Sequence, residues 1–110
     1  MLRIAMSAGA SNLLRALIAR ARVPRDRILL TNVQSTDWQS LTLTGERHQF
    51  DLRIADPHSD AVATRICAGL EDAEFSIPGL IVADIAVVEE PVSAIDGSTS
   101  VTIEALTIEE

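Results

Sequence analysis

The strongest constraint on the fold is a run of residues in which polar and apolar side chains alternate one by one. Phe50, Leu52 and Ile54 occupy every second position, so they share one face of an extended chain, and the polar residues between them share the other face. His48 is in phase with the apolar set. The pattern predicts a long antiparallel strand with one face in a core and the other in solvent.

The chain is long enough for one hydrophobic core but not for two. It has 110 residues, of which 47% are hydrophobic and only 3% aromatic. The core must therefore be mainly aliphatic, with Phe50 and Phe75 as its rare large side chains. We predict a single domain over residues 1–110.

Two helices are predicted from apolar residues spaced three and four apart. The first has Ser11 as its N-cap and ends before Pro24. The second has Ser59 or Asp60 as its N-cap, runs to Leu70 and carries an apolar residue every four positions. Each helix has one apolar stripe, which favours packing on a sheet.

The remaining apolar segments are interpreted as strands separated by turns. A strand is expected over residues 28–33, followed by a turn or bulge over 35–37 that Trp38 anchors. Residues 80–88 are apolar enough for a central strand that ends before Pro91. A hairpin tip over 96–98 leads into the last strand, where the alternation shifts phase after Ala105 and indicates a β-bulge.

These elements define an α+β fold. We predict a mainly antiparallel sheet of about four strands with two helices packed on one face, in the order α-β-β-α-β-β. No apolar stretch reaches the roughly 18 residues that a membrane span requires, so no membrane partner is expected.

Charge divides the chain into two unlike halves. The net charge is −7, with eight arginines and four acidic residues over 1–53 but one arginine and twelve acidic residues over 54–110. The acidic balance argues against duplex binding. Three interpretations stay open for the basic half: contact with phosphate, a solvated helix face and loop, or one side of a head-to-tail contact between copies.

The sequence contains no arrangement of residues that is typical of catalysis or cofactor binding. We interpret His48 as a satisfied, partly buried histidine and Cys67 as a small core residue. Zinc-ligand spacing and glycine-rich phosphate loops are missing. We therefore expect no catalytic residues, no metal and no cofactor, and a protein that is not an enzyme. Asp84 interrupts an apolar run and is expected either at an edge or exposed outward, or else opposite a partner subunit.

Four local sequences, taken in order, carry a family resemblance: residues 35–38, residues 45–48 leading into 50–54, the helix over 60–70, and residues 77–82. In this order they resemble the tail completion proteins of long-tailed phages and gene transfer agents, also called tail terminator or tail-to-head joining proteins. The similarity covers about residues 28–109. This sequence differs from the family at residues 23–27, where the family commonly has an Asp-Gly-Val-Pro-like loop.

The resemblance implies a structural protein of the virion that is made in the bacterial cytoplasm. Such a protein forms a six-membered ring on the finished tail tube, stops its polymerisation and joins it to the head connector. Its partners are other copies of itself, the tail tube protein and the connector, and DNA only passes through the channel. An acidic surface suits a channel to which DNA must not adhere.

The contacts of such a ring are expected to involve basic residues of one copy and acidic residues of the next, together with the segment from Trp38 to Glu46. A different class of function remains open, namely a small-ligand-binding or regulatory α+β domain whose pocket lies between sheet and helices, with His48 and Asp51 near its mouth. The residues predicted to contact another subunit or partner are Arg25, Arg27, Asp37, Trp38, Arg47, Asp84, Glu89, Glu90 and Glu104.

Overall fold

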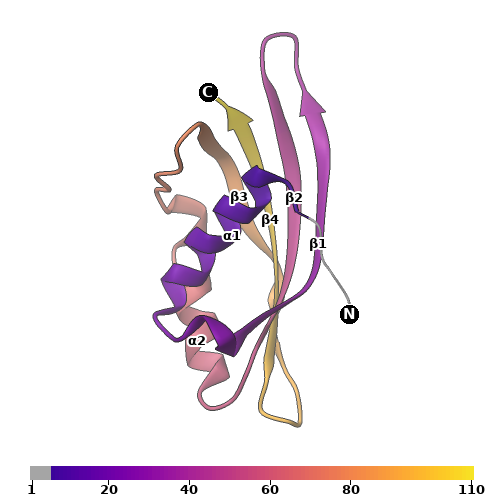
Figure 1. The fold of residues 1–110 in the computed structure, drawn as a ribbon. Coiled ribbons are helices and arrows are strands. Elements are labelled where there is room, and N and C mark those ends of the chain that lie inside the picture. Colours follow the sequence, from indigo (N-terminus) through magenta and orange to yellow (C-terminus); the bar gives the residue numbers. More distant parts are fainter. Residues whose placement is uncertain (1–5) are drawn as a thin grey trace.

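The computed structural model describes residues 6–110 as a four-stranded antiparallel sheet with two α-helices on one of its faces (Figure 1). This architecture and its element order confirm the predicted α+β fold. The helices are α1 (Ala8–Ala21) and α2 (Ser59–Cys67), the short 3-10 turns are η1 (Arg25–Arg27) and η2 (Leu70–Asp72), and the strands are β1 (Ile28–Gln39), β2 (Thr44–Ile54), β3 (Leu80–Ser93) and β4 (Thr99–Glu109).

The strands lie in the order β1-β2-β4-β3, so β1 and β3 are the edges of the sheet. The prediction that residues 80–88 form a central strand is therefore wrong. Ile85 is buried, and Val82 and Val87 pack against the core. The apolar composition of β3 reflects this inner face and not a central position. The strand also passes through Pro91 to Ser93, which an edge strand tolerates because one side of its backbone has no ladder to maintain.

The first hairpin is longer than predicted. Residues 35–37 form no turn, because Ser35, Thr36 and Asp37 pair in register with β2. The turn lies at the end of β1, where the Ser40 amide donates to the Leu43 carbonyl over 2.9 Å. Cross-strand pairing has here overridden the turn preference of short polar residues.

Both helix starts differ from the prediction by a few residues. Ser7, not Ser11, is the N-cap of α1 and accepts a hydrogen bond from the Ala10 amide. Ser59 is the first residue of α2 and does not cap it. Its hydroxyl instead donates to the Gly97 carbonyl over 2.5 Å. The second helix also ends at Cys67, before the predicted Leu70, which lies in η2.

The β3–β4 hairpin has its tip at the predicted residues, 96–98, and is fixed to β2. The Ser98 hydroxyl and amide donate to the Asp96 carboxylate over 2.6 and 3.0 Å. These hydrogen bonds, assisted by Arg53, lower the pKa of Asp96 below its ordinary value. Arg53 of β2 forms an ion pair with the same carboxylate.

The alternation of β4 does not shift phase after Ala105, because Thr107 is buried in phase with Ala105 and the residue between them is only partly buried. The pairing of β4 with β2 runs unbroken past this position. The pairing of β3 with β4 shifts instead between Val82 and Asp84, which leaves Ala83 as the extra residue. The bulge is therefore in β3 and not in β4.

The core lies between the helices and the inner face of the sheet. Leu13 and Leu17 of α1 and Ile66 of α2 are fully buried, as are Phe50 and Ile103 of the two central strands. Within residues 6–110, no helix is long and apolar enough to cross a membrane.

Two arginines join the helices at their C-terminal ends. Arg65 of α2 donates from Nε to the Ala21 carbonyl at the end of α1 over 2.9 Å. Arg20 of α1 donates from Nε to the Ile66 carbonyl of α2 over 3.0 Å, and it also reaches the Ala68 carbonyl. Each cation thus satisfies carbonyls that a helix end leaves without a partner.

We expect Arg20→Met to lower the free energy of unfolding by about 1.5–3 kcal/mol, because methionine keeps an apolar stem but loses the charged hydrogen bonds. Urea unfolding measures the change. Arg15→Met, at an exposed position of the same helix, is the matched control and should change stability by less than about 0.5 kcal/mol. Equal effects of the two substitutions would contradict a bridging role for Arg20.

Candidate functional site: the open sheet face and its edges

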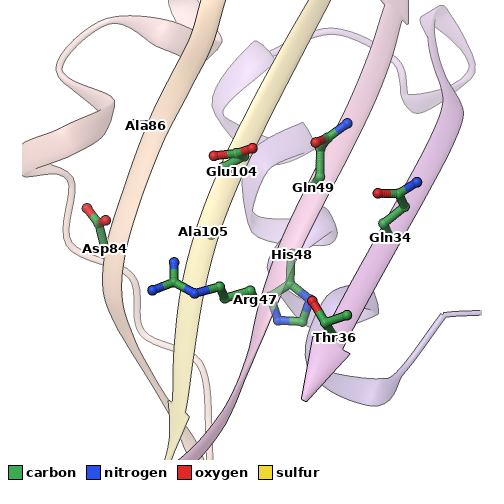
Figure 2. Close-up of a pocket in the computed structure, with 9 residues that line it drawn as sticks. All are labelled: Gln34, Thr36, Arg47, His48, Gln49, Asp84, Ala86, Glu104 and Ala105. Carbon is green, nitrogen blue, oxygen red and sulfur yellow. The ribbon is translucent and has the colours of Figure 1, made fainter. Parts of the chain in front are cut away.

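The face of the sheet that the helices leave uncovered contains a polar hollow of about 260 Å³. Three of the predicted contact residues meet there: Arg47 from β2, Glu104 from β4 and Asp84 from β3 (Figure 2). We call this site the open-face hollow. The other residues that line it are Gln34, Thr36, His48, Gln49, Ala86 and Ala105.

The strand register explains why these charges converge. Arg47 is paired with Leu106, and Leu106 is paired in turn with Asp84, so Arg47 and Asp84 lie on one row across β4. Figure 2 shows the Arg47 side chain extending along this row toward Asp84. All three charged residues of the hollow are exposed, so water screens their attraction. The arrangement suits reversible polar contact with a partner.

The other predicted contact residues lie toward the two opposite edges of the sheet. Arg25 is exposed in η1, directly before edge strand β1, and Asp37 and Trp38 lie near the far end of that strand. Glu89 and Glu90 are exposed on edge strand β3. The structure thus brings three of the nine residues together and distributes the rest along the edges.

Arg27 has a role within the chain that the sequence did not reveal. Its guanidinium donates to the Ala55 carbonyl over 2.7 Å and to the Pro57 carbonyl. These bonds fasten η1 to the loop that follows β2. The side chain is therefore already engaged and is a weaker candidate for contact with a neighbour than Arg25.

His48 is buried on the helix-covered face, as its phase in β2 predicts. Its Nδ1 lies 2.7 Å from the Ser35 hydroxyl of β1, and its Nε2 lies 2.9 Å from the Thr107 hydroxyl of β4. Because a hydroxyl either donates or accepts, both ring nitrogens are satisfied in either neutral tautomer. Burial lowers the pKa of His48 below its ordinary value of 6.5, although nearby Glu46 opposes the shift. The ring is a satisfied structural histidine that joins three strands.

This environment makes stability depend on pH in a defined direction. As pH falls through about 6.5 the unfolded chain takes up a proton on His48, whereas the folded chain resists until its lower pKa is reached. Stability contributed by the neutral ring is therefore complete above about pH 6.5 and is lost as pH falls from there toward the folded pKa.

We expect the unfolding free energy of the wild-type chain to fall more between pH 7.5 and pH 5.5 than that of His48→Gln. Glutamine keeps hydrogen-bonding capacity but does not titrate. Urea unfolding at the two pH values measures both differences. The two proteins have the same carboxylates, so the titration of these groups contributes equally to both and cancels in the comparison. An equal fall in both would show that His48 does not couple to folding.

The surroundings of Cys67 and Asp51 can be compared with what was predicted for these two residues. Cys67 packs against the core, and burial raises the pKa of its thiol, in agreement with its interpretation as a core residue. Asp51 accepts a hydrogen bond from Asn32 over 3.3 Å on the open face. His48 and Asp51 therefore face opposite sides of β2, so the pocket mouth that would combine them does not form.

Of the exposed apolar side chains on the hairpin tips, Leu41 and Leu43 lie within the predicted contact segment from Trp38 to Glu46, whereas Ile95 was not predicted to take part in a contact. Leu41 lies fully exposed at the tip of the β1–β2 hairpin, with Leu43 half-exposed beside it. Ile95 lies fully exposed at the tip of the β3–β4 hairpin. Leu41 and Leu43 alternate with polar residues, so they resemble strand residues in sequence. The sequence signal for Ile95 was its position directly before the turn residues Asp96-Gly97.

Comparison with protein-family models, with curated proteins and with solved structures finds no match for this chain.

Proposed function

We propose that this chain is a non-enzymatic virion assembly protein that forms a ring on the finished tail tube of a long-tailed phage or gene transfer agent and joins it to the head connector. The ring would be a hexamer. The tail location is based on the resemblance of residues 28–109 to tail completion proteins. An assembly role is supported independently by where the exposed apolar side chains lie.

These side chains gather on two hairpin tips and two edge strands. A soluble monomer exposes single apolar residues anywhere on its surface, whereas clusters on projecting elements are typical of contacts with other macromolecules. Within residues 6–110, the exposed large apolar residues are Leu29 in β1, Leu41 and Leu43 at one tip, Ile81, Val88 and Val92 in β3, and Ile95 at the other tip.

The two hairpin tips lie at opposite ends of the molecule (Figure 1). The longest axis of the chain extends 47 Å. With Leu41 at one end and Ile95 at the other, a ring of such subunits would present a different apolar rim on each side. A protein between a tail tube and a head connector needs two such unlike faces.

Deletion of the gene from a strain that produces the particles tests this function. Negative-stain microscopy should show overlong tails or tails without heads, and complementation with the wild-type gene should restore normal particles. Complementation with Leu41→Asp or Ile95→Asp should fail, whereas Ala61→Asp, at an exposed position of α2, should restore them. Normal joined particles in the deletion strain would overturn the proposal.

A second candidate function, binding of a small polar ligand, is favoured by the open-face hollow. Its Arg47 beside Asp84 and Glu104 suits a ligand that carries both charges. A thermal-shift screen of amino acids and related zwitterions tests this function. Saturable stabilisation that Arg47→Gln abolishes would favour ligand binding over assembly.

A further inference from the structure

We infer that one copy of this chain contacts the next by placing its β1 edge beside the β3 edge of its neighbour, so that the antiparallel sheet continues from subunit to subunit. The two copies lie at the same height along the strand direction. This inference builds on the proposed ring and identifies its subunit contact. The occupant of each free edge is thus a second copy of the same chain.

Strand direction makes this contact compatible with the sheet. The order β1-β2-β4-β3 is antiparallel at every step, so β1 and β3 run in opposite directions at the two edges. A second copy placed beside the first in the same orientation therefore sets β3 antiparallel to β1. The helices of both copies then stay on the same side of the extended sheet.

The register within one chain specifies which residues would be level across the boundary. Leu29 in β1 pairs with Arg53 in β2, Arg53 pairs with Ser100 in β4, and Ser100 pairs with Val92 in β3. Leu29 and Val92 are therefore level, which means that they lie at the same height along the strands. The same procedure places Asn32 level with Glu89. It also places Thr36 level with Asp84, and Trp38 level with Ile81.

The resulting pairs are chemically complementary. Leu29 and Val92 are 60% and 62% exposed in the single chain, and both would be covered by an apolar partner. Trp38, the only tryptophan, would cover Ile81 at the other end of the edge. Between them the side chains of Asn32 and Thr36 would donate to the carboxylates of Glu89 and Asp84.

Charge favours the same head-to-tail order. Arg25 lies exposed next to the start of β1, and Glu89 and Glu90 lie exposed toward the end of β3. In the proposed alignment Glu89 is level with Asn32, so Arg25 and the acidic residues lie apart along the same boundary and attract each other at long range. Attraction between unlike edges would guide one copy onto the next and disfavour contact between two β3 edges.

The irregularities of β3 restrict how this contact is made. The register shifts at three places along the strand, and Pro91 has no amide proton to donate. Bulges and proline protect an edge from indiscriminate pairing. Specific side-chain pairs must therefore supply most of the contact, which makes its register sharply defined and testable.

Disulfide cross-linking of the full-length chain in a Cys67→Ser background tests the register. Asn32→Cys with Glu89→Cys and Thr36→Cys with Asp84→Cys are the level pairs. Residues opposite each other on antiparallel strands have Cα atoms about 4.5–5.5 Å apart, within disulfide range. Within a single chain the same residues are separated by three strand spacings, about 14 Å, so only an intermolecular bond can form.

The crossed pairs are matched controls that use the same four cysteines. Asn32→Cys with Asp84→Cys, and Thr36→Cys with Glu89→Cys, would be displaced along the strand by four residues, about 13 Å, beyond disulfide range. Mild oxidation followed by non-reducing electrophoresis should show covalent dimers and larger species for the level pairs and none above background for the crossed pairs. Circular dichroism melts confirm that all four variants fold.

Equal cross-linking of level and crossed pairs, or a wild-type chain that sediments as a monomer at the same concentration, would overturn this contact. These outcomes differ from failure of the proposed function. Normal particles in the deletion strain would remove the tail role but leave a measured edge-to-edge register standing. Defective particles together with failed cross-linking would keep the tail role and exclude this subunit contact.

Discussion

Gly45→Ala is expected to lower the free energy of unfolding by more than about 3 kcal/mol, or to prevent folding altogether. A Cβ atom at position 45 would lie 2.0 Å from the carbonyl oxygen of Thr107 on the neighbouring strand. That oxygen belongs to the backbone, so relief requires β2 and β4 to separate. These are the two central strands of the sheet, and separating them would open the core. Urea unfolding followed by circular dichroism measures the loss.

Gly79→Ala separates this steric effect from backbone strain. Gly79 has a positive φ of 80°, but a Cβ atom there would meet nothing within 4 Å. We expect its substitution to destabilise the chain by only about 1–2 kcal/mol, the usual penalty for a non-glycine residue in that conformation. If the two variants lose equal stability, close approach to Thr107 is not the reason for glycine at position 45.

The contrast at Gly45 shows what the sequence could and could not specify. The sequence marks position 45 only as a glycine inside a strand pattern, and the structure reveals that the strands approach too closely there for any side chain. The alternation of Phe50, Leu52 and Ile54 correctly predicted a half-buried strand, because a period of two matches the geometry of an extended chain and not that of a helix. Long-range pairing partners leave no comparable local pattern.

The errors in the strands have the same origin. Residues 35–37 favour a turn when considered locally, yet their pairing with β2 makes them part of β1. Residues 80–88 are apolar enough for a central strand, but the order of the strands places them at an edge. Both outcomes depend on which strand lies alongside, and this is decided by the whole sheet rather than by the segment itself.

The candidate site was predictable as a set of residue types but not as an arrangement. Arg47, Asp84 and Glu104 are far apart in sequence and converge only because β2, β4 and β3 are neighbours. Arg27 has the same side chain as Arg25, and nothing in the sequence indicates that the carbonyl groups of residues 55 and 57 occupy it. Charge patterning therefore indicated contact surfaces, and the fold assigns each charge to a face or an edge.

Phe50→Ala is expected to lower the free energy of unfolding by about 3–5 kcal/mol. Phe50 is the largest of the fully buried side chains, and the mainly aliphatic core around it has few large residues to fill the space that it would leave. Its ring also stacks on His48, with centroids 5.9 Å apart and planes inclined by 23°. Urea unfolding measures the stability, and Phe75→Ala, at a partly buried position, is the control with the smaller loss.

The same substitution should change the titration of His48 in the folded chain. Burial is the main cause of its lowered pKa, and a cavity beside the ring admits water more readily than a packed phenyl group. We therefore expect the His48 pKa, followed by the NMR shifts of its ring protons, to rise toward 6.5 in Phe50→Ala and to stay unchanged in Phe75→Ala. A large loss of stability with an unchanged His48 pKa would mean that the cavity persists but stays dry. Such a result would show that the histidine owes its burial to the strands and not to Phe50.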